Sequence, residues 1–212
     1  MSPSHIRRRG LLPPANERFR DMGVFLVASE DTFAVEQYFD ALRANGVFDT
    51  RRVVVRVLST DDSRRSDPTS VRLRLAEVER ALDERVDADE RWLCLDVDHW
   101  ATGRHAPNLA RACKEALDAG YQLAISNPAF EVWLLLHFSD EPKPTQAECE
   151  AAIRSIIGSY NKARLQPEIY TREAVDLAIA RARALDTNRT QRWPQESGSH
   201  VYRLVERLPR RV

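Results

Sequence analysis

The sequence has no excess of charge of either sign, because 32 Lys and Arg residues balance 32 Asp and Glu residues among its 212 residues. The overall charge therefore provides no general attraction to nucleic acid, and any such binding must come from local basic patches. No apolar run approaches the roughly 20 residues needed to span a bilayer, and the N-terminal arginines are not followed by the apolar segment of a signal peptide. These absences predict a cytoplasmic protein that does not contact a membrane.

Cysteine is scarce, and the common catalytic motifs are missing. The three cysteines are odd in number and form no C-x-x-C pair, which argues against a disulfide framework and a zinc site. His99, His105 and His137 lack the spacing of metal ligands, so we expect them to serve structure or the surface. The chain has no Walker A, G-x-G-x-x-G or G-x-S-x-G motif, which excludes the usual nucleotide-binding and serine-hydrolase classes.

What the sequence does contain is an alternation of short apolar runs with helical patterns. The runs cover residues 23–28, 52–58, 92–95 and 121–125, and an amphipathic or apolar helical segment follows each of them. Four strand-helix pairs in succession predict an α/β fold with a parallel four-stranded sheet flanked by helices.

The two ends of the chain follow different patterns. Residues 1–22 are rich in arginine and show no periodicity, so we predict a flexible basic N-terminal arm there. The α/β domain is predicted over residues 23–139. A polar connector then leads to three helical patterns, which predict a C-terminal helical annex over residues 140–212.

Acidic residues follow two of the predicted strands. Glu30 comes after the first apolar run, and Asp96 and Asp98 come after the third. Because ligands bind outside the carboxyl ends of strands in open α/β sheets, we expect these carboxylates at one edge. Asp96 and Asp98 alternate with one apolar residue and so point to one face, where a hard cation such as Mg²⁺ would neutralise them. The alternatives are a solvated strand end for the aspartates and a helix-terminal charge for Glu30.

A further polar group interrupts the apolar segment after the fourth strand. Asn127 is predicted to cap a long hydrophobic helix, with Pro128 at its first position. Capping alone would explain both residues. Glu131 lies among apolar neighbours, where an unpaired carboxylate would be costly, so we expect it to face the acidic edge as a supporting residue or a direct ligand.

Basic side chains in the predicted annex are candidates for contact with phosphate. Lys162, within Tyr160-Asn161-Lys162, and Arg189 are the two that we select for binding nucleic acid. The alternative is that they lie on ordinary solvated helix faces.

The order of these motifs resembles RloB-like proteins, a family with a Toprim-like fold. The residues that carry the resemblance are Ser29-Glu30-Asp31, Tyr38-Phe39, Asp96, Asp98 and the segment from Ser126 to His137, which matches S-N-P-x-F-E-x-W-L-x-L-H. The resemblance covers residues 23–138, and the final helix is also similar. One departure concerns the turn after Glu30, where many members have a glycine and a second glutamate but this chain has Asp31, Phe33 and Val35.

The resemblance implies a function. Toprim domains use a glutamate and a D-x-D pair to bind Mg²⁺ and to make or break phosphodiester bonds, which would make Glu30 the catalytic glutamate and Asp96 and Asp98 metal ligands. It predicts a Mg²⁺-dependent (or Mn²⁺-dependent) nuclease for DNA or RNA, including tRNA, that acts in antiviral defence beside an ATPase partner. Assembly of the chain into a homo-oligomer is a further expectation.

Two rival functions remain at this stage. One is a non-catalytic subunit that binds nucleic acid or an ATPase partner and is indifferent to metal. The other keeps the acidic centre but uses it for phosphoryl chemistry on free nucleotides.

Overall fold

The computed structural model describes residues 22–60, 66–81, 88–98 and 106–210. Its strands are β1 (Gly23–Ser29), β2 (Val53–Leu58), β3 (Glu90–Asp96), β4 (Gln122–Asn127) and β5 (Gly198–Ser199). Its helices are α1 (Ala34–Ala44), α2 (Pro68–Ala81), α3 (Ala106–Asp118), α4 (Phe130–Leu135), α5 (Gln146–Ile157), α6 (Arg172–Leu185) and α7 (Val201–Arg207), with a 3₁₀ turn η3 (Pro167–Ile169). The predicted N-terminal arm, apart from Met22, and both His99 and His105 lie outside the described residues.

The strands form one sheet in the order β2-β1-β3-β4-β5. β1 pairs in parallel with both β2 and β3, and β3 pairs in parallel with β4, which confirms the predicted α/β fold class and its four strands. The prediction did not include β5, which adds an antiparallel edge where Ser126 pairs with Ser199. A strand of two residues is too short to produce a recognisable sequence pattern.

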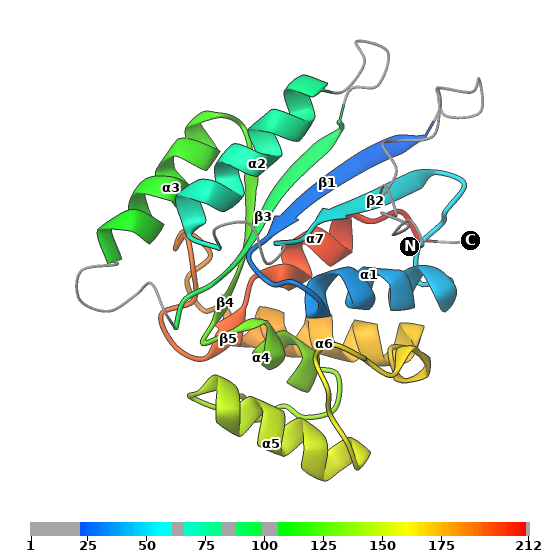
Figure 1. Cartoon of the computed structure of the whole chain (residues 1–212). Coiled ribbons are helices and arrows are strands. Elements are labelled where there is room, and N and C mark those ends of the chain that lie inside the picture. The colour runs from blue at the N-terminus through cyan, green and yellow to red at the C-terminus, as the bar shows by residue number, and fades with distance from the viewer. Residues whose placement is uncertain (1–21, 61–65, 82–87, 99–105, 211–212) are drawn as a thin grey trace, which may run out of the picture.

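Helices cover both faces of the sheet, as Figure 1 shows. Successive side chains of β1 alternate between the faces, as a strand requires. Leu26 and Ala28 join the apolar cluster under α2 and α3, whereas Phe25 and Val27 join the cluster under α1, α4 and the C-terminal helices. Both faces of β1 are therefore buried, which explains its continuous apolar sequence.

The C-terminal helices belong to the larger of these two clusters. Cys149 and Ile153 of α5, Val175 of α6 and Val205 of α7 are buried in the same cluster as α1 and α4. One core therefore contains residues of both the predicted α/β domain (23–139) and the predicted annex (140–212). The division of the chain into these two parts stays a prediction.

Several helix ends follow from local sequence. The side chain of Asp67 accepts the backbone N–H of Ser70 at 3.1 Å, directly before Pro68 opens α2. Thr145 accepts the N–H of Glu148 at 3.2 Å and caps α5. Gly158 ends α5 with a φ of 82°, in the left-handed region that glycine adopts without strain.

The predicted start of the helix after β4 is wrong. Asn127 is the last residue of β4, and α4 begins at Phe130 without a side-chain cap. Asn127 pairs with Gly198 of β5, and its side-chain amide donates to the carbonyls of Pro194 and Gln195 at 3.0 and 3.1 Å. The Asn127 side chain is therefore bound by the loop before β5, and the residue that precedes the first turn of α4 is Ala129. The helix is also short, because the apolar run continues beyond Leu135 as turns.

Among the described helices, none is both long and apolar enough to cross a bilayer.

Candidate functional site: an acidic edge of the sheet

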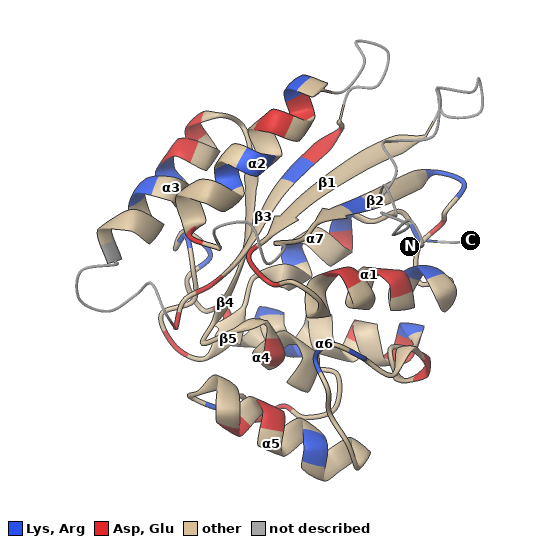
Figure 2. Ribbon diagram, in the orientation of Figure 1, with Lys and Arg blue, Asp and Glu red and all other residues tan. Residues whose placement is uncertain are grey.

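The centre of the sheet contains a point where the strand order reverses. β1 and β3 are neighbours, but the chain leaves β1 towards β2 on one side and leaves β3 towards β4 on the other. In open α/β sheets such a reversal leaves a crevice at the carboxyl ends of the two strands, where ligands bind. Acidic segments lie at both strand ends and on nearby α4 (Figure 2). We call the side chains of Glu30, Asp31, Asp96, Asp98 and Glu131 the acidic edge.

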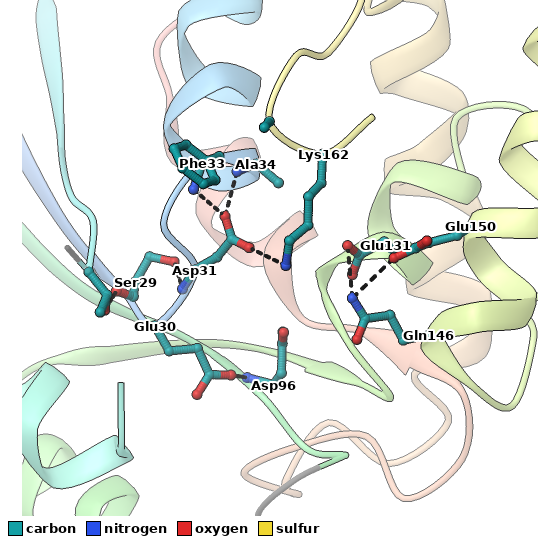
Figure 3. A network of polar contacts seen from close by, with 12 residues as sticks. Ser29, Glu30, Asp31, Phe33, Ala34, Asp96, Glu131, Gln146, Glu150 and Lys162 are labelled. Carbon is teal, nitrogen blue, oxygen red and sulfur yellow. Dashed lines mark hydrogen bonds and ion pairs between the residues drawn. The ribbon is translucent and has the colours of Figure 1, made fainter. Parts of the chain in front are cut away.

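Glu30 and Asp96 are brought together as predicted. The Glu30 carboxylate accepts the backbone N–H of Asp96, as Figure 3 shows. The backbone N–H of Glu30 also donates to the carbonyl of Cys94 at 3.4 Å. These two contacts join the ends of β1 and β3, so the position of Glu30 is fixed by β3 as well as by its own strand.

The pKa of Asp96 is strongly perturbed. Burial raises its pKa well above the ordinary value, and the nearby carboxylates of Glu30, Glu131, Asp98 and Asp31 raise it further. Both causes disfavour the charged form of Asp96. A cation at this position would reverse the second effect, because it favours the ionised carboxylate.

Asp98 is held by the segment that follows β4. The backbone N–H groups of Val97 and Asp98 both donate to the carbonyl of Pro128 at 3.0 Å. Val97 N–H also lies 2.9 Å from the carbonyl of Ser126. The Ser126–Pro128 segment therefore positions the D-x-D turn through its backbone carbonyls. From the sequence, this segment was predicted to cap a helix instead.

Asp31 is a member of the edge that was not among the site residues predicted from the sequence. Its side chain accepts the N–H of Phe33 at 2.7 Å and that of Ala34, which begins α1. Its second oxygen lies 3.5 Å from the ammonium of Lys162. Asp31 thus shapes the turn after Glu30 and adds negative charge to the edge.

Lys162 lies against the acidic edge (Figure 3). Burial opposes its charged form, but the carboxylates of Asp31, Glu131 and Asp96 outweigh this effect and raise its pKa. Lys162 therefore stays protonated at neutral pH and partly neutralises the edge. The sequence analysis selected Lys162 for contact with phosphate, and that role remains a prediction.

Glu131 is the innermost carboxylate, with a relative exposure of 2%. Its Oε1 accepts the hydroxyl of Tyr160 at 3.1 Å and the side-chain amide of Gln146 at 3.2 Å. Burial raises its pKa, while these donors and Lys162 favour the charged form. The predicted cost of an unpaired carboxylate is avoided, and Glu131 supports the edge from behind.

Sequence reasoning missed Arg74, which lies beside the edge. It is 5% exposed and donates to the carbonyls of Ser29 and Leu58 at 3.0 Å and to the hydroxyl of Thr60 at 2.9 Å. Arg74 therefore ties together the carboxyl ends of β1 and β2. The sequence did contain one signal: Arg74 directly precedes Leu75, which was predicted to face inward on α2. An arginine near the core needs hydrogen-bond partners, because burying an unpaired charge is costly.

The remaining residues of the family-like segments form an aromatic cluster. The ring of Tyr38 contacts those of Phe130, Trp133, His137 and Tyr170 at centroid distances of 5.4 to 6.1 Å. The Tyr38 hydroxyl lies 3.1 Å from Nε2 of His137, whose Nδ1 lies 3.0 Å from the carbonyl of Trp133. This cluster anchors α4 to α1, so most of these residues act in packing rather than in chemistry.

Arg189 is not part of the acidic edge. It lies in the loop after α6 and lines a separate cavity together with Gln122, at the start of β4. The structure therefore brings Lys162, but not Arg189, to the predicted carboxylates.

The donor set of the edge suits a hard cation, since every candidate ligand is a carboxylate oxygen. Within the described ranges, no three or more His, Cys, Asp or Glu side chains are grouped closely enough to hold one metal ion between them. Mg²⁺ needs only one or two carboxylates, with water in the other positions. Burial is the main cause of the raised pKa of Asp96, and the neighbouring carboxylates add to it, which is the part of the effect that a cation relieves.

The fold and the edge together define an α/β protein with carboxylates converging at the reversal point of a mostly parallel sheet. The chain belongs to the RloB-like protein family, whose model matches residues 25–208. No curated protein and no solved structure matches the chain. The family match extends through α7, well beyond the 23–138 segment on which the resemblance rested.

Proposed function

We propose that the acidic edge is the centre of a Mg²⁺-dependent nuclease that hydrolyses phosphodiester bonds in DNA or RNA, including structured tRNA. The observation that carries the proposal is the junction of Glu30 with the backbone of Asp96 at the point where the strand order reverses. In support of the proposal, Glu30 contacts the first residue of the D-x-D pair, and the ion pair of Asp31 with Lys162 involves the residue next to Glu30.

Each side chain has a role in this proposal. Asp96 and Asp98 would hold the cation, and Glu30 would complete its coordination or accept a proton from the attacking water. When bound, Mg²⁺ supplies charge neutralisation at the phosphate and activation of that water. Asp31 keeps Lys162 at the edge through an ion pair at 3.5 Å, where the ammonium can also pair with a phosphate oxygen of the substrate.

The proposal is tested by cleavage of a panel of single- and double-stranded DNA, RNA and tRNA with Mg²⁺ or Mn²⁺. We expect metal-dependent cutting by the wild type that Glu30→Gln and Asp96→Asn each reduce at least a hundredfold, since general acid–base groups typically contribute 10²–10⁴-fold. Glu77→Gln is the matched control, because Glu77 is an exposed carboxylate on α2. Equal cleavage by all four proteins would contradict the proposal.

The same panel separates the rivals. Hydrolysis of free nucleotides without cleavage of polymers would indicate other phosphoryl chemistry. Nucleic-acid binding that is indifferent to metal and to Asp96→Asn, with no cleavage, would indicate a non-catalytic subunit. A wild type that is silent alone but active with a co-expressed ATPase would place the chain in a two-component defence system.

We further propose that the protein acts in the cytoplasm as an effector of antiviral defence. The support for this is membership of the RloB-like family together with the acidic edge. A phage-challenge assay checks the proposal: cells carrying the locus should survive as a population, and cells carrying Asp96→Asn should not.

A further inference from the structure

A second charged feature lies beside the start of β4, away from the carboxyl ends of the strands. An open cavity of about 540 Å³ is bordered by the start of β4, by α7 and by the loop that joins α6 to β5. Its lining includes Arg183, Arg189, Arg192, Arg203 and Arg207, with a single acidic residue, Glu206. We call this feature the arginine cavity.

The cavity exists because β4 is only partly covered. β3 pairs with β4 along one side, but on the opposite side β5 pairs with Ser126 and Asn127 alone, and no other strand in the described part of the chain pairs with β4 on that side. Gln122 at the start of β4 is therefore exposed and forms part of the cavity wall. Trp92 and Tyr202 also border the cavity, but both are almost fully buried.

The arginines fall into two groups. Arg183, Arg203 and Arg207 each pair with a carboxylate, from Glu206, Asp186 and Glu90 respectively. The exposed side chains of Arg189 and Arg192 have no such partner among the described residues. The cavity thus has a local positive charge that the neutral overall composition conceals.

The loop that carries these two arginines is tied to the acidic edge. Asn127 donates to the carbonyls of Pro194 and Gln195 at 3.0 and 3.1 Å, and its neighbour Ser126 pairs with Asp96 across the strands. From Gln122 to Asn127 a strand advances about 16 Å, at roughly 3.3 Å per residue. A polymer can reach both features at once, whereas a mononucleotide cannot.

We propose that the arginine cavity holds backbone phosphates of the nucleic acid whose scissile bond lies at the acidic edge. Guanidinium groups match phosphate oxygens in geometry and charge, and the acidic edge repels an anionic polymer unless a cationic surface compensates. The proposal rests on the function proposed above, and it adds the surface through which Arg189 and Arg192 retain the substrate.

Binding without catalysis tests it directly. Fluorescence anisotropy of labelled DNA and RNA oligonucleotides is measured in EDTA, across a salt series, for the wild type and for Arg189→Ala/Arg192→Ala. We expect the Kd to rise about tenfold or more in the double variant, because two charge-assisted contacts are lost. The slope of log K against log salt should fall by about 1.4 to 1.8, the share of two phosphates.

The matched control is Arg80→Ala/Arg154→Ala, which removes the same charge from exposed positions on α2 and α5. It should bind like the wild type. A wild type that binds no nucleic acid, an unchanged Kd in the Arg189/Arg192 variant, or an equal loss in the control would each overturn the inference.

The two proposals can fail separately. Binding that depends on Arg189 and Arg192 without any metal-dependent cleavage would sustain the arginine cavity and reject the nuclease. Cleavage that is unaffected by the double variant would sustain the nuclease and reject the cavity.

Discussion

Single residues at the acidic edge differ in what compensates their charge. Glu131 is almost fully buried, but a tyrosine hydroxyl and a side-chain amide donate to it. The pKa of Asp96 is raised first by burial and then by the other carboxylates that surround it. The charge of Glu131 is thus compensated by groups of the protein itself, whereas a bound cation would stabilise the charged form of Asp96. This contrast separates a supporting residue from a candidate ligand.

His137 offers a test of buried charge away from the edge. Burial lowers its pKa to about 4, against roughly 6.5 in an unfolded chain. Between these two values the unfolded state binds more protons, so the free energy of unfolding is fully retained above pH 6.5 and falls as the pH drops towards 4. The expected contribution is up to about 1.4 kcal/mol per pH unit.

Urea unfolding of the wild type and of His137→Gln between pH 4 and 7 measures this contribution. The variant should be less stable at pH 7, because the contact with Tyr38 is altered, but its stability should depend less on pH. Identical pH slopes for the two proteins would show that His137 does not titrate as described.

The residues of the acidic edge were only partly predictable. Glu30, Asp96 and Asp98 follow apolar runs, and strand ends meet at one edge, so local pattern was sufficient. Lys162 lies 131 residues from Asp31 in sequence, and no local pattern indicates that they pair. Asn127 was assigned as a cap because an Asn-Pro pair favours helix starts, whereas the pairing with β5 decides its conformation.

At the scale of elements, the packing of α4 against α1 explains why the family-like segments contain so many aromatic residues. Tyr38 on α1 contacts Phe130 and Trp133 on α4 edge-to-face. These contacts hold α4 in place, and α4 carries Glu131 to the edge. The aromatic cluster therefore acts on the site through the position of one helix.

Trp133 provides a measurement of this packing. It is fully buried, and its ring packs edge-to-face against Tyr38 at a centroid distance of 6.1 Å. Trp133→Ala should lower the free energy of unfolding by about 3–5 kcal/mol, and Trp133→Phe by less, because an aromatic ring still fills the site. Leu177→Ala is the control, since Leu177 is 50% exposed on α6.

Chemical denaturation of the three variants checks the prediction. A loss in Leu177→Ala comparable to that in Trp133→Ala would mean that the aromatic cluster has no special part in stability.

Elements with strong local signals were predicted well, and the others were not. The apolar runs, the cap at Thr145 and the glycine stop at Gly158 identified β1 to β4 and the bounds of α5. The length of α4 was wrong because a buried apolar run has the same composition in a helix and in a turn. β5 depends on long-range pairing, which sequence periodicity does not report.

At the scale of the whole molecule, the C-terminal helices and the sheet share one core. α7 packs on β4, α6 contacts α4 and α7, and their buried residues belong to the cluster under α1. A chain truncated after residue 139 would expose the apolar residues that this cluster covers, at a cost of about 25 cal/mol for each Å².

We therefore expect the fragment 1–139 to lack cooperative unfolding. Near-ultraviolet circular dichroism and a thermal scan of the fragment, compared with the full chain, measure this. A fragment with a sharp transition and a native-like spectrum would show instead that residues 23–139 fold as a separate domain.

The balance of charge also has meaning at this scale. The overall charge is zero, yet the acidic edge and the arginine cavity separate the signs along the flank of the sheet. Composition alone could not reveal this, because it averages over regions that the fold keeps apart.

The central claim is that Asp96 and its neighbours bind a divalent cation. The most direct measurement is the binding of Mn²⁺, followed by electron paramagnetic resonance, to the wild type, Glu30→Gln, Asp96→Asn and the control Glu77→Gln. We expect the wild type and the control to bind Mn²⁺, the Asp96 substitution to abolish binding and the Glu30 substitution to weaken it. No Mn²⁺ binding by the wild type, or equal binding by all four proteins, would contradict it.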